Sequence, residues 1–288
     1  MTDRYLDPTN DVAFKKLFSN KERLINLLNS ILNLQEGNKI IELNYVSSEQ
    51  LPLFLDGKRS LFDLKVRDQS GLWYIVEMQR KMEKDYLNRA QAYGCYTYVN
   101  QISEGMRYND LLPVIVISII GTKALPDTLP YISYHHLKES TTNEQFLFSL
   151  TYVFIELGKL DPNKITTDIE QWLHLLKCAV REQEPPKEIV NDQVLSAYSD
   201  LEKYRWSASE HDAYFRCQMA IEQETDKFEE MEKQIEESYS EGKAEGKAER
   251  DIEIAKRMLT KGKSIVEIAE FTDLSVQDLT KLGGSSGD

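Results

Sequence analysis

Residues 60–68 are Ser-Leu-Phe-Asp-Leu-Lys-Val-Arg-Asp, and residues 72–79 are Leu-Trp-Tyr-Ile-Val-Glu-Met-Gln. Both stretches combine apolar and aromatic residues with partial alternation, which predicts two β-strands. The Gln-Ser-Gly segment between them, ending at Gly71, is typical of a tight turn. The sequence therefore predicts a β-hairpin that carries acidic side chains where a core strand would carry apolar ones.

Three polar residues of this hairpin, Asp63, Glu77 and Gln79, form a candidate catalytic site. Side chains alternate across a strand, so Glu77 and Gln79 point to one face, and in normal register Asp63 comes within reach of the same ion. Oxygen ligands of this kind suit a hard divalent cation, which can polarise a phosphoryl oxygen and activate water. The alternative is a hairpin face that simply meets solvent.

Further segments, taken in order with the hairpin, have the spacing of a known family. They are residues 7–18 (DPTNDVAFKKLF), 56–60 (DGKRS), 89–93 (RAQAY), 113–118 (PVIVIS) and the C-terminal Glu-Gly-Lys-Ala repeats. With Asp63 followed after thirteen residues by Glu77-Met78-Gln79, the chain resembles the bacterial recombination-promoting nuclease and transposase family of the PD-(D/E)XK superfamily. The resemblance covers nearly the whole chain and is weakest between residues 160 and 235.

The resemblance implies a restriction-endonuclease-like α/β fold, in which a mixed sheet is flanked by helices and followed by a mostly helical C-terminal region. It also implies a metal-dependent DNA endonuclease that hydrolyses phosphodiester bonds in recombination or in processing of mobile or foreign DNA. Its cofactor would be Mg²⁺, with Mn²⁺ as a second candidate. The alternative is a catalytically silent nuclease fold that serves DNA binding or regulation.

Site roles follow from the same resemblance. Asp63 and Glu77 would be the metal ligands, with the backbone carbonyl of Met78 as a third oxygen. Gln79 stands where the superfamily usually carries lysine. This departure puts the rate in question more than the binding, because glutamine can donate a hydrogen bond but brings no charge.

Five more residues are candidates around this site. Lys65, and Lys81 if the second strand continues that far, could supply the missing positive charge. Asp11 is either an additional site carboxylate or a first-turn acid that complements its helix dipole. Lys15 and Arg89 are expected to contact phosphate rather than perform chemistry.

The charge distribution bears on DNA as a partner. The net charge of the chain is -13. Residues 1–150 carry a net charge of -1 and residues 151–288 carry -12, so the acidic excess lies outside the expected catalytic half. We therefore expect modest, salt-sensitive affinity for DNA phosphates.

Location and thiol chemistry follow from composition. No apolar run reaches the ~18–20 residues that span a bilayer, and the first residues have no apolar signal core, so a cytoplasmic protein without membrane contact is expected. Cys95, Cys178 and Cys217 lack zinc-site spacing and are expected to be buried thiols. His135 and His136 are expected at a strand end or in a loop.

Periodicity predicts helices over residues 11–34, 85–102, 166–181, 187–202 and about 213–258, and strands over residues 39–48, 112–120 and 145–157. The first elements give the αβββαβ order of a restriction-endonuclease-like core. We expect a nuclease core over 1–160, a helical extension over 161–235 and a C-terminal region over 236–288.

The C-terminal region begins with a tandem repeat that places Gly242 and Gly246 in a helix. Glycine costs about 1 kcal/mol against alanine in a helix, which favours a flexible connector over a site of close helix–helix approach. A small helix-turn-helix-like module follows, with Ser264 and Ser275 as N-caps, and 283–288 is expected to be a flexible tail. The module is either a weak DNA reader or a dimerisation element, and the chain is expected to self-associate through its C-terminal helices.

Overall fold

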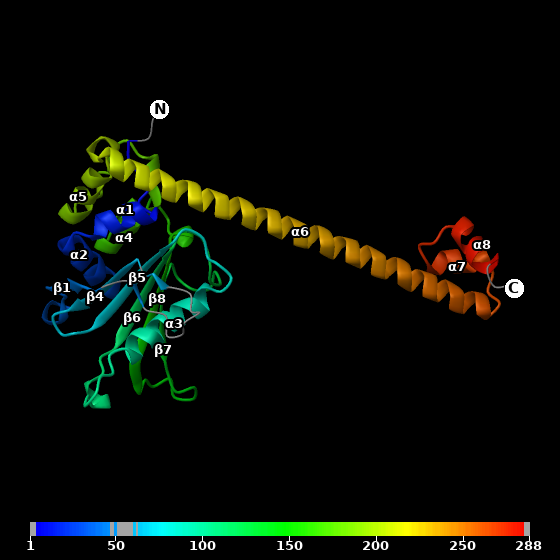
Figure 1. The fold of residues 1–288 in the computed structure, drawn as a ribbon, viewed down its shortest axis with the longest axis horizontal. Coiled ribbons are helices and arrows are strands. Elements are labelled where there is room, and N and C mark those ends of the chain that lie inside the picture. The colour runs from blue at the N-terminus through cyan, green and yellow to red at the C-terminus, as the bar shows by residue number, and fades with distance from the viewer. Residues whose placement is uncertain (1–3, 47–48, 51–59, 62, 285–288) are drawn as a thin grey trace. The chain divides into compact units, whose positions relative to one another are not determined.

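The computed structural model describes residues 4–46, 49–50, 60–61 and 63–284 (Figure 1). Six of its strands form one mixed sheet with the order β1-β4-β5-β6-β8-β7. In chain order they are β1 (Leu43–Tyr45), β4 (Leu64–Asp68), β5 (Trp73–Gln79), β6 (Val114–Ile120), β7 (Ile132–Leu137) and β8 (Leu147–Glu156). A separate short ladder pairs β2 (Glu49–Gln50) with β3 (Ser60–Leu61).

The predicted hairpin is present as β4 and β5, which pair antiparallel with Leu64 opposite Val76. Asp68 Oδ1 builds the turn by accepting the backbone N–H groups of Ser70 at 2.8 Å and Leu72 at 3.0 Å. Gly71 has a φ of +89°, which L side chains rarely adopt. The turn chemistry therefore sets the register that places the acidic residues of the two strands.

Helices cover both faces of the sheet. Four helices pack on the face that carries Val66 and Val76: α1 (Asp11–Phe18), α2 (Lys21–Leu32), α4 (Asp168–Cys178) and α5 (Asp192–Leu201). Helix α3 (Tyr86–Val99) packs on the opposite face, against Ile75 and Val116 (Figure 1). The predicted fold class, a mixed sheet flanked by helices and followed by a helical C-terminal region, is confirmed.

The N-terminal prediction of one helix over 11–34 is wrong, because the chain breaks between α1 and α2. Asn20 is the N-cap of α2, and its side chain accepts the backbone N–H groups of Glu22 at 3.0 Å and Arg23 at 3.3 Å. A side chain that satisfies these first amides begins a new helix. The strand predicted over 39–48 is confined to β1, and residues 47–48 lie outside the described part.

The second half follows the predicted elements with shifted boundaries. Strand β8 matches the strand expected over 145–157, whereas β7 is an additional edge strand that carries His135 and His136 in its second half. Helix α4 begins at a capping box of Thr167 and Glu170, and α5 begins after Asn191. Short 3₁₀ segments lie at η1 (Glu36–Asn38), η2 (Tyr108–Asp110), η3 (Leu157–Lys159), η4 (Ala179–Arg181) and η5 (Lys203–Arg205).

The chain falls into two compact units, Met1–Gln218 and Met219–Asp288. Helix α6 (Ala208–Thr260) belongs to both. In the second unit the end of α6 packs with α7 (Ile265–Phe271) and α8 (Val276–Gly284) around Ala255, Ile268 and Leu279. The expected caps form there, since Ser264 and Ser275 accept backbone N–H groups at the helix starts.

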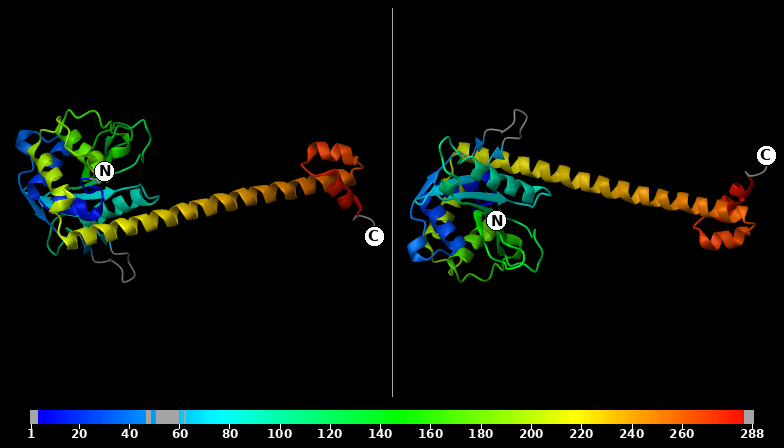
Figure 2. Two further views of the ribbon diagram at one scale, coloured as in Figure 1. Left: turned by 90° about the horizontal axis from the view of Figure 1, so that it is seen from above. Right: turned by 90° about the horizontal axis from the view of Figure 1, so that it is seen from below.

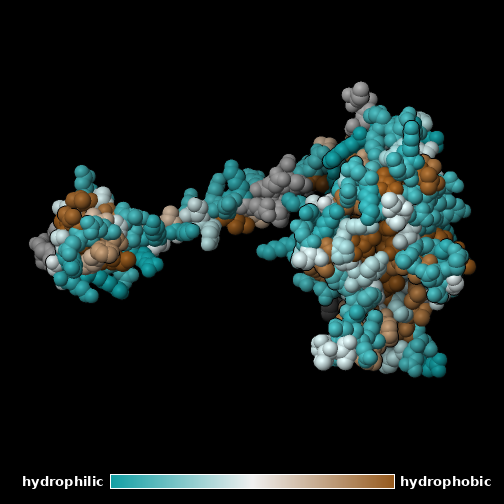
Figure 3. Space-filling model, turned by 180° about the vertical axis from the view of Figure 1, so that it is seen from behind, coloured by the Kyte–Doolittle hydropathy of each residue, from teal (hydrophilic) through white to brown (hydrophobic). Residues whose placement is uncertain are grey.

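Helix α6 is continuous through the glycine repeat, where a flexible connector was expected (Figure 2). A Cβ added at Gly242 or Gly246 would meet nothing within 4 Å, so no described segment packs closely there. Hydrophilic residues dominate the surface of this helix (Figure 3). The predicted tail is also corrected: Gly283 and Gly284 belong to α8, and residues 285–288 lie outside the described part.

The three cysteines are free, but the prediction that they are buried is wrong: Cys95 is exposed, and Cys178 and Cys217 are half-buried. None of the helices in the described residues is long and apolar enough to cross a membrane.

Candidate active site

The side chains of Asp63 and Glu77 lie together at the open end of the hairpin, and each accepts a hydrogen bond from a backbone N–H of the opposite strand segment. Asp63 immediately precedes β4, and extending the β4–β5 register places it opposite Glu77. Its backbone N–H donates to Glu77 Oε1 at 3.3 Å, and its Oδ2 accepts the backbone N–H of Met78 at 2.6 Å. The two carboxyl groups are therefore on one side of the hairpin and within reach of one another.

Both carboxyl groups are withdrawn from water, since Glu77 is 3 % exposed and the Asp63 side chain 15 % exposed. Burial raises the pKa of Asp63, and the neighbouring Asp11 carboxyl raises it further, against the lowering effect of the Met78 N–H. Burial also raises the pKa of Glu77, followed by repulsion from Asp63. Two buried acids that resist ionisation together are stabilised by a nearby cation.

Helix α1 brings Asp11 and Lys15 to the same place. Asn10 caps the helix by accepting the backbone N–H of Val12, which leaves Asp11 in the first turn. Lys15 Nζ donates to Asp11 Oδ2 at 3.0 Å and lies 3.8 Å from Asp63 Oδ1. Asp11 Oδ1 lies 2.8 Å from the same Lys15 Nζ, so both oxygens of this carboxyl group contact the lysine. Asp11 thus occupies both positions considered for it, the helix start and the neighbourhood of Asp63.

Helix α3 brings a second cation to the other end of the site. Arg89 Nη2 donates to Gln79 Oε1 at 3.1 Å, and Arg89 Nη1 lies 2.6 Å from Glu83 Oε2. The guanidinium charge also lowers the pKa of Glu77 against the larger effect of burial. Arg89 is therefore close to the side chains of Glu77 and Gln79 on β5. Spacing along the sequence alone could not establish this contact.

The two lysines considered as replacements for a lysine at position 79 lie differently. Lys65 is buried, and its Nζ lies 4.9 Å from the centre of the Trp73 ring, four residues before Glu77 on β5. Burial lowers the pKa of this amine. Strand β5 ends at Gln79, so side-chain alternation does not carry Lys81 onto the same face.

Ser118 and Tyr86 border the site and were not predicted. Ser118 is opposite Glu77 on β6, and its Oγ accepts the Tyr86 hydroxyl at 2.8 Å. Both residues are buried, and Tyr86 is the first residue of α3, where the Arg89 guanidinium lies 5.1 Å from the centre of its ring. A signal existed in the sequence, because Ser118 is the only polar residue in Val114–Ile120.

The donor set fits a hard cation only in part. No group of three or more His, Cys, Asp or Glu side chains in the described chain is arranged to hold a metal ion. Asp63 and Glu77 do supply two neighbouring carboxylates, and the Asp11 carboxyl group, which is paired with Lys15, lies near Asp63. Carboxylate and backbone carbonyl oxygens are suitable ligands for Mg²⁺ or Mn²⁺, with water completing the shell.

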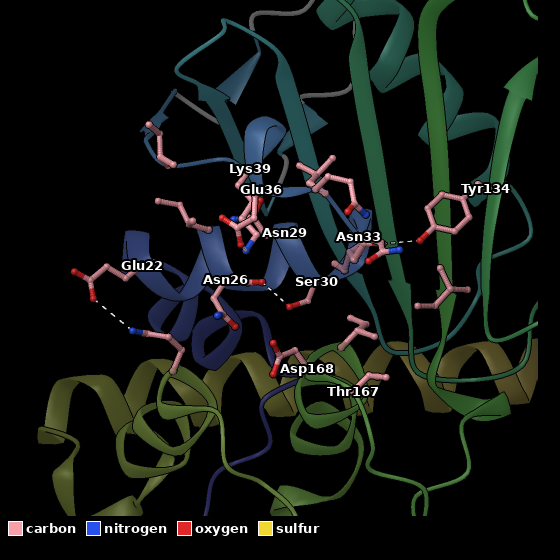
Figure 4. A pocket seen from close by; sticks show the side chains of 18 residues that line it. Glu22, Asn26, Asn29, Ser30, Asn33, Glu36, Lys39, Tyr134, Thr167 and Asp168 are labelled. Carbon is pink, nitrogen blue, oxygen red and sulfur yellow. Dashed lines mark hydrogen bonds and ion pairs between the residues drawn. The ribbon is translucent and has the colours of Figure 1, made fainter.

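A groove of about 930 Å³ between α2, β7 and the start of α4 is a poorer candidate (Figure 4). Its polar groups are already used inside the fold. Asn26 Oδ1 accepts the Trp172 indole N–H at 2.7 Å, Asn29 bonds the backbone of Ile40, and Tyr134 donates to Ile31. These contacts tie the helices and the strand together.

Comparison with known proteins identifies the family of the chain. No curated protein and no solved structure matches the chain. A family model described as PD-(D/E)XK nuclease family transposase matches residues 8–234, which include α1, the hairpin, α3 and the whole six-stranded sheet. Because that match covers most of the sequence, the chain belongs to the PD-(D/E)XK nuclease family transposases.

Proposed function

We propose that this chain is a metal-dependent DNA endonuclease that hydrolyses phosphodiester bonds. The observation that carries the proposal is the pair formed by Asp63 and Glu77, joined through Met78 N–H and Asp63 N–H at the end of β5. Membership of the PD-(D/E)XK nuclease family transposases supports nuclease chemistry, and the arrangement of these acids supports hydrolysis at that place. We expect the enzyme to act in recombination or in the processing of mobile or foreign DNA.

Asp63, Glu77 and the Met78 carbonyl would hold Mg²⁺ or Mn²⁺. When bound, the ion supplies Lewis-acid stabilisation of the phosphate and lowers the pKa of the attacking water. Lys15, 38 % exposed beside Asp63, is placed to contact a phosphate oxygen. Asp11 orients Lys15, whose Nζ lies 2.8 Å from Asp11 Oδ1 and 3.0 Å from Asp11 Oδ2.

DNA is the proposed partner, and the balance of charge supports weak electrostatic attraction. The first 150 residues carry a net charge of only -1, and metal binding at Asp63 and Glu77 would make this part less negative. Affinity should therefore be modest and should fall as salt rises. We place this activity in the cytoplasm.

Self-association through the C-terminal helices remains part of the proposal. Met231, Ile235 and Tyr239 are exposed on α6 at four-residue spacing, which places them along one side of the helix. Deleting residues 236–288 and measuring molecular mass in solution tests this role. An unchanged mass would remove residues 236–288 from the explanation.

The second candidate is a catalytically silent DNA-binding or regulatory protein, favoured by the uncharged side chain of Gln79. Cleavage of supercoiled plasmid in Mg²⁺ or Mn²⁺ separates the two. Asp63→Asn and Glu77→Gln should abolish nicking, whereas Asp127→Asn, which neutralises an exposed acid paired with Lys123, should leave it unchanged. DNA binding without turnover by the native protein would support the silent alternative.

A further inference from the structure

The side chain of Gln79 has a defined orientation. Arginine can only donate hydrogen bonds, so the group of Gln79 that faces Arg89 Nη2 at 3.1 Å must be the amide oxygen. The amide nitrogen therefore points away from Arg89. Within the described residues Gln79 Nε2 has no hydrogen-bond acceptor. The backbone carbonyl of Gln79 accepts the backbone N–H of Gly121 at 2.7 Å, which fixes the main chain at this position.

Arg89 is itself fixed on two further sides. Its Nη1 lies 2.6 Å from Glu83 Oε2, and its guanidinium lies 5.1 Å from the centre of the Tyr86 ring. Its Nε is buried and has no hydrogen-bond partner among the described residues. The guanidinium is thus held beside Glu77 and Gln79 with limited freedom to move.

Resting on the nuclease function proposed above, we propose that Gln79 and Arg89 act as one unit in place of the superfamily lysine. Gln79 Nε2 donates to a phosphate oxygen of the bound DNA. Arg89 is a positioning residue that fixes the amide and places a positive charge directly behind it.

The physical basis is polarisation of the amide. A hydrogen bond from a cation to the amide oxygen draws electron density from the nitrogen, which makes its N–H groups stronger donors. A donor that is already oriented costs no reorganisation when charge develops on the phosphate. An isolated glutamine would have neither property, which explains how position 79 can dispense with lysine.

Other cations are less suited to this task. Lys65 lies over Trp73, and Lys15 is held by Asp11 on the Asp63 side of the site. Arg89 contacts the side chain at position 79 directly. The proposal therefore makes the effect of Arg89 depend on which residue occupies position 79.

A double-mutant cycle tests this dependence by single-turnover cleavage in Mn²⁺ and by binding of a labelled DNA duplex in Ca²⁺. Arg89→Ala should lower the cleavage rate constant by about 10- to 100-fold, since it removes one preorganised donor system. With Gln79→Lys already present, Arg89→Ala should have no effect or raise the rate. Arg89→Lys keeps the positive charge and the helix, so its cleavage rate constant should lie between those of wild type and Arg89→Ala. Arg107 is an exposed arginine paired with Asp110, and Arg107→Ala should cleave at the wild-type rate.

An equal loss from Arg89→Ala in both backgrounds would overturn the proposal, because a purely structural role does not depend on position 79. An unchanged rate in Arg89→Ala would also overturn it. If the wild type binds DNA but does not cleave it, the nuclease function fails, and the same cycle in duplex affinity decides the proposal. The side-chain amide resonance of Gln79, assigned from its loss in Gln79→Glu, should also shift in Arg89→Lys, and an unmoved resonance would contradict it.

Discussion

The Asp63 carboxylate accepts a hydrogen bond from the backbone N–H of Met78 at 2.6 Å, between the two β5 residues Glu77 and Gln79. This bond links the Asp63 side chain, which lies just before β4, to the last residues of the neighbouring strand β5. Asp63 is therefore held by a hydrogen bond to the backbone of β5, and Glu77 is held by its position within that strand.

Removing either acid should remove metal binding. We expect Asp63→Asn and Glu77→Gln to lower Mn²⁺ affinity and cleavage by at least about a hundredfold, because each neutralises half of a carboxylate pair. Isothermal calorimetry and plasmid nicking measure the two effects. Asp127→Asn serves as the control, and unaltered Mn²⁺ binding in both site variants would show that the ion binds elsewhere.

The metal-free protein should lose stability as pH rises. The pKa values of Asp63 and Glu77 are raised in the folded state, so the folded protein binds protons more tightly than the unfolded chain. Their contribution is fully present below about pH 4, the ordinary carboxyl range, and is lost as pH rises through the raised values.

Thermal unfolding of metal-free wild type and Asp63→Asn from acidic to mildly alkaline pH measures this contribution. The variant should be the more stable protein at alkaline pH and should show a flatter pH dependence. Wild type that gains stability relative to Asp63→Asn as pH rises would contradict the sign.

Asp11→Asn distinguishes a site role from a purely helical one. The Asp11 carboxyl group neighbours Asp63 and holds Lys15 beside it, so we expect Mn²⁺ affinity to fall about tenfold, as for loss of an outer ligand partner. A first-turn acid without a site role would leave metal affinity unchanged and alter only stability. Calorimetry at a pH where both hairpin acids are ionised separates these outcomes.

Gly71→Ala should destabilise the first unit. Gly71 has a φ of +89°, and a Cβ there would lie 2.7 Å from Leu112 Cδ1. We expect a loss of about 1–3 kcal/mol in unfolding free energy, read by tryptophan fluorescence in denaturant. Gly37→Ala, where a Cβ meets nothing within 4 Å, is the control and should change stability little.

Alanine at Gly242 and Gly246 should strengthen α6. Because a Cβ at either position meets nothing, each change should stabilise the helix by about 1 kcal/mol. Circular dichroism should show higher helicity at elevated temperature. If the glycines instead allow two copies of α6 to approach closely, the same variants will weaken self-association in sedimentation experiments.

Local sequence rules predicted the hairpin well. Alternation along residues 72–79 and the turn ending at Gly71 located β5, and the register then brought Asp63 opposite Glu77. The same rules failed at Asn20, where a capping side chain divided a helix that periodicity alone joined. They also missed β7, which depends on pairing with β8 and not on its own pattern.

The sequence by itself determined the strand pair, the acids on it and the family to which they belong, because these follow from residues close together in the chain. Only the tertiary structure decided that Lys15 reaches Asp63 and that Arg89 reaches Gln79. Those contacts depend on how α1 and α3 pack on opposite faces of the sheet. Packing is set by buried side chains from many segments, so spacing along one segment carries no information about it.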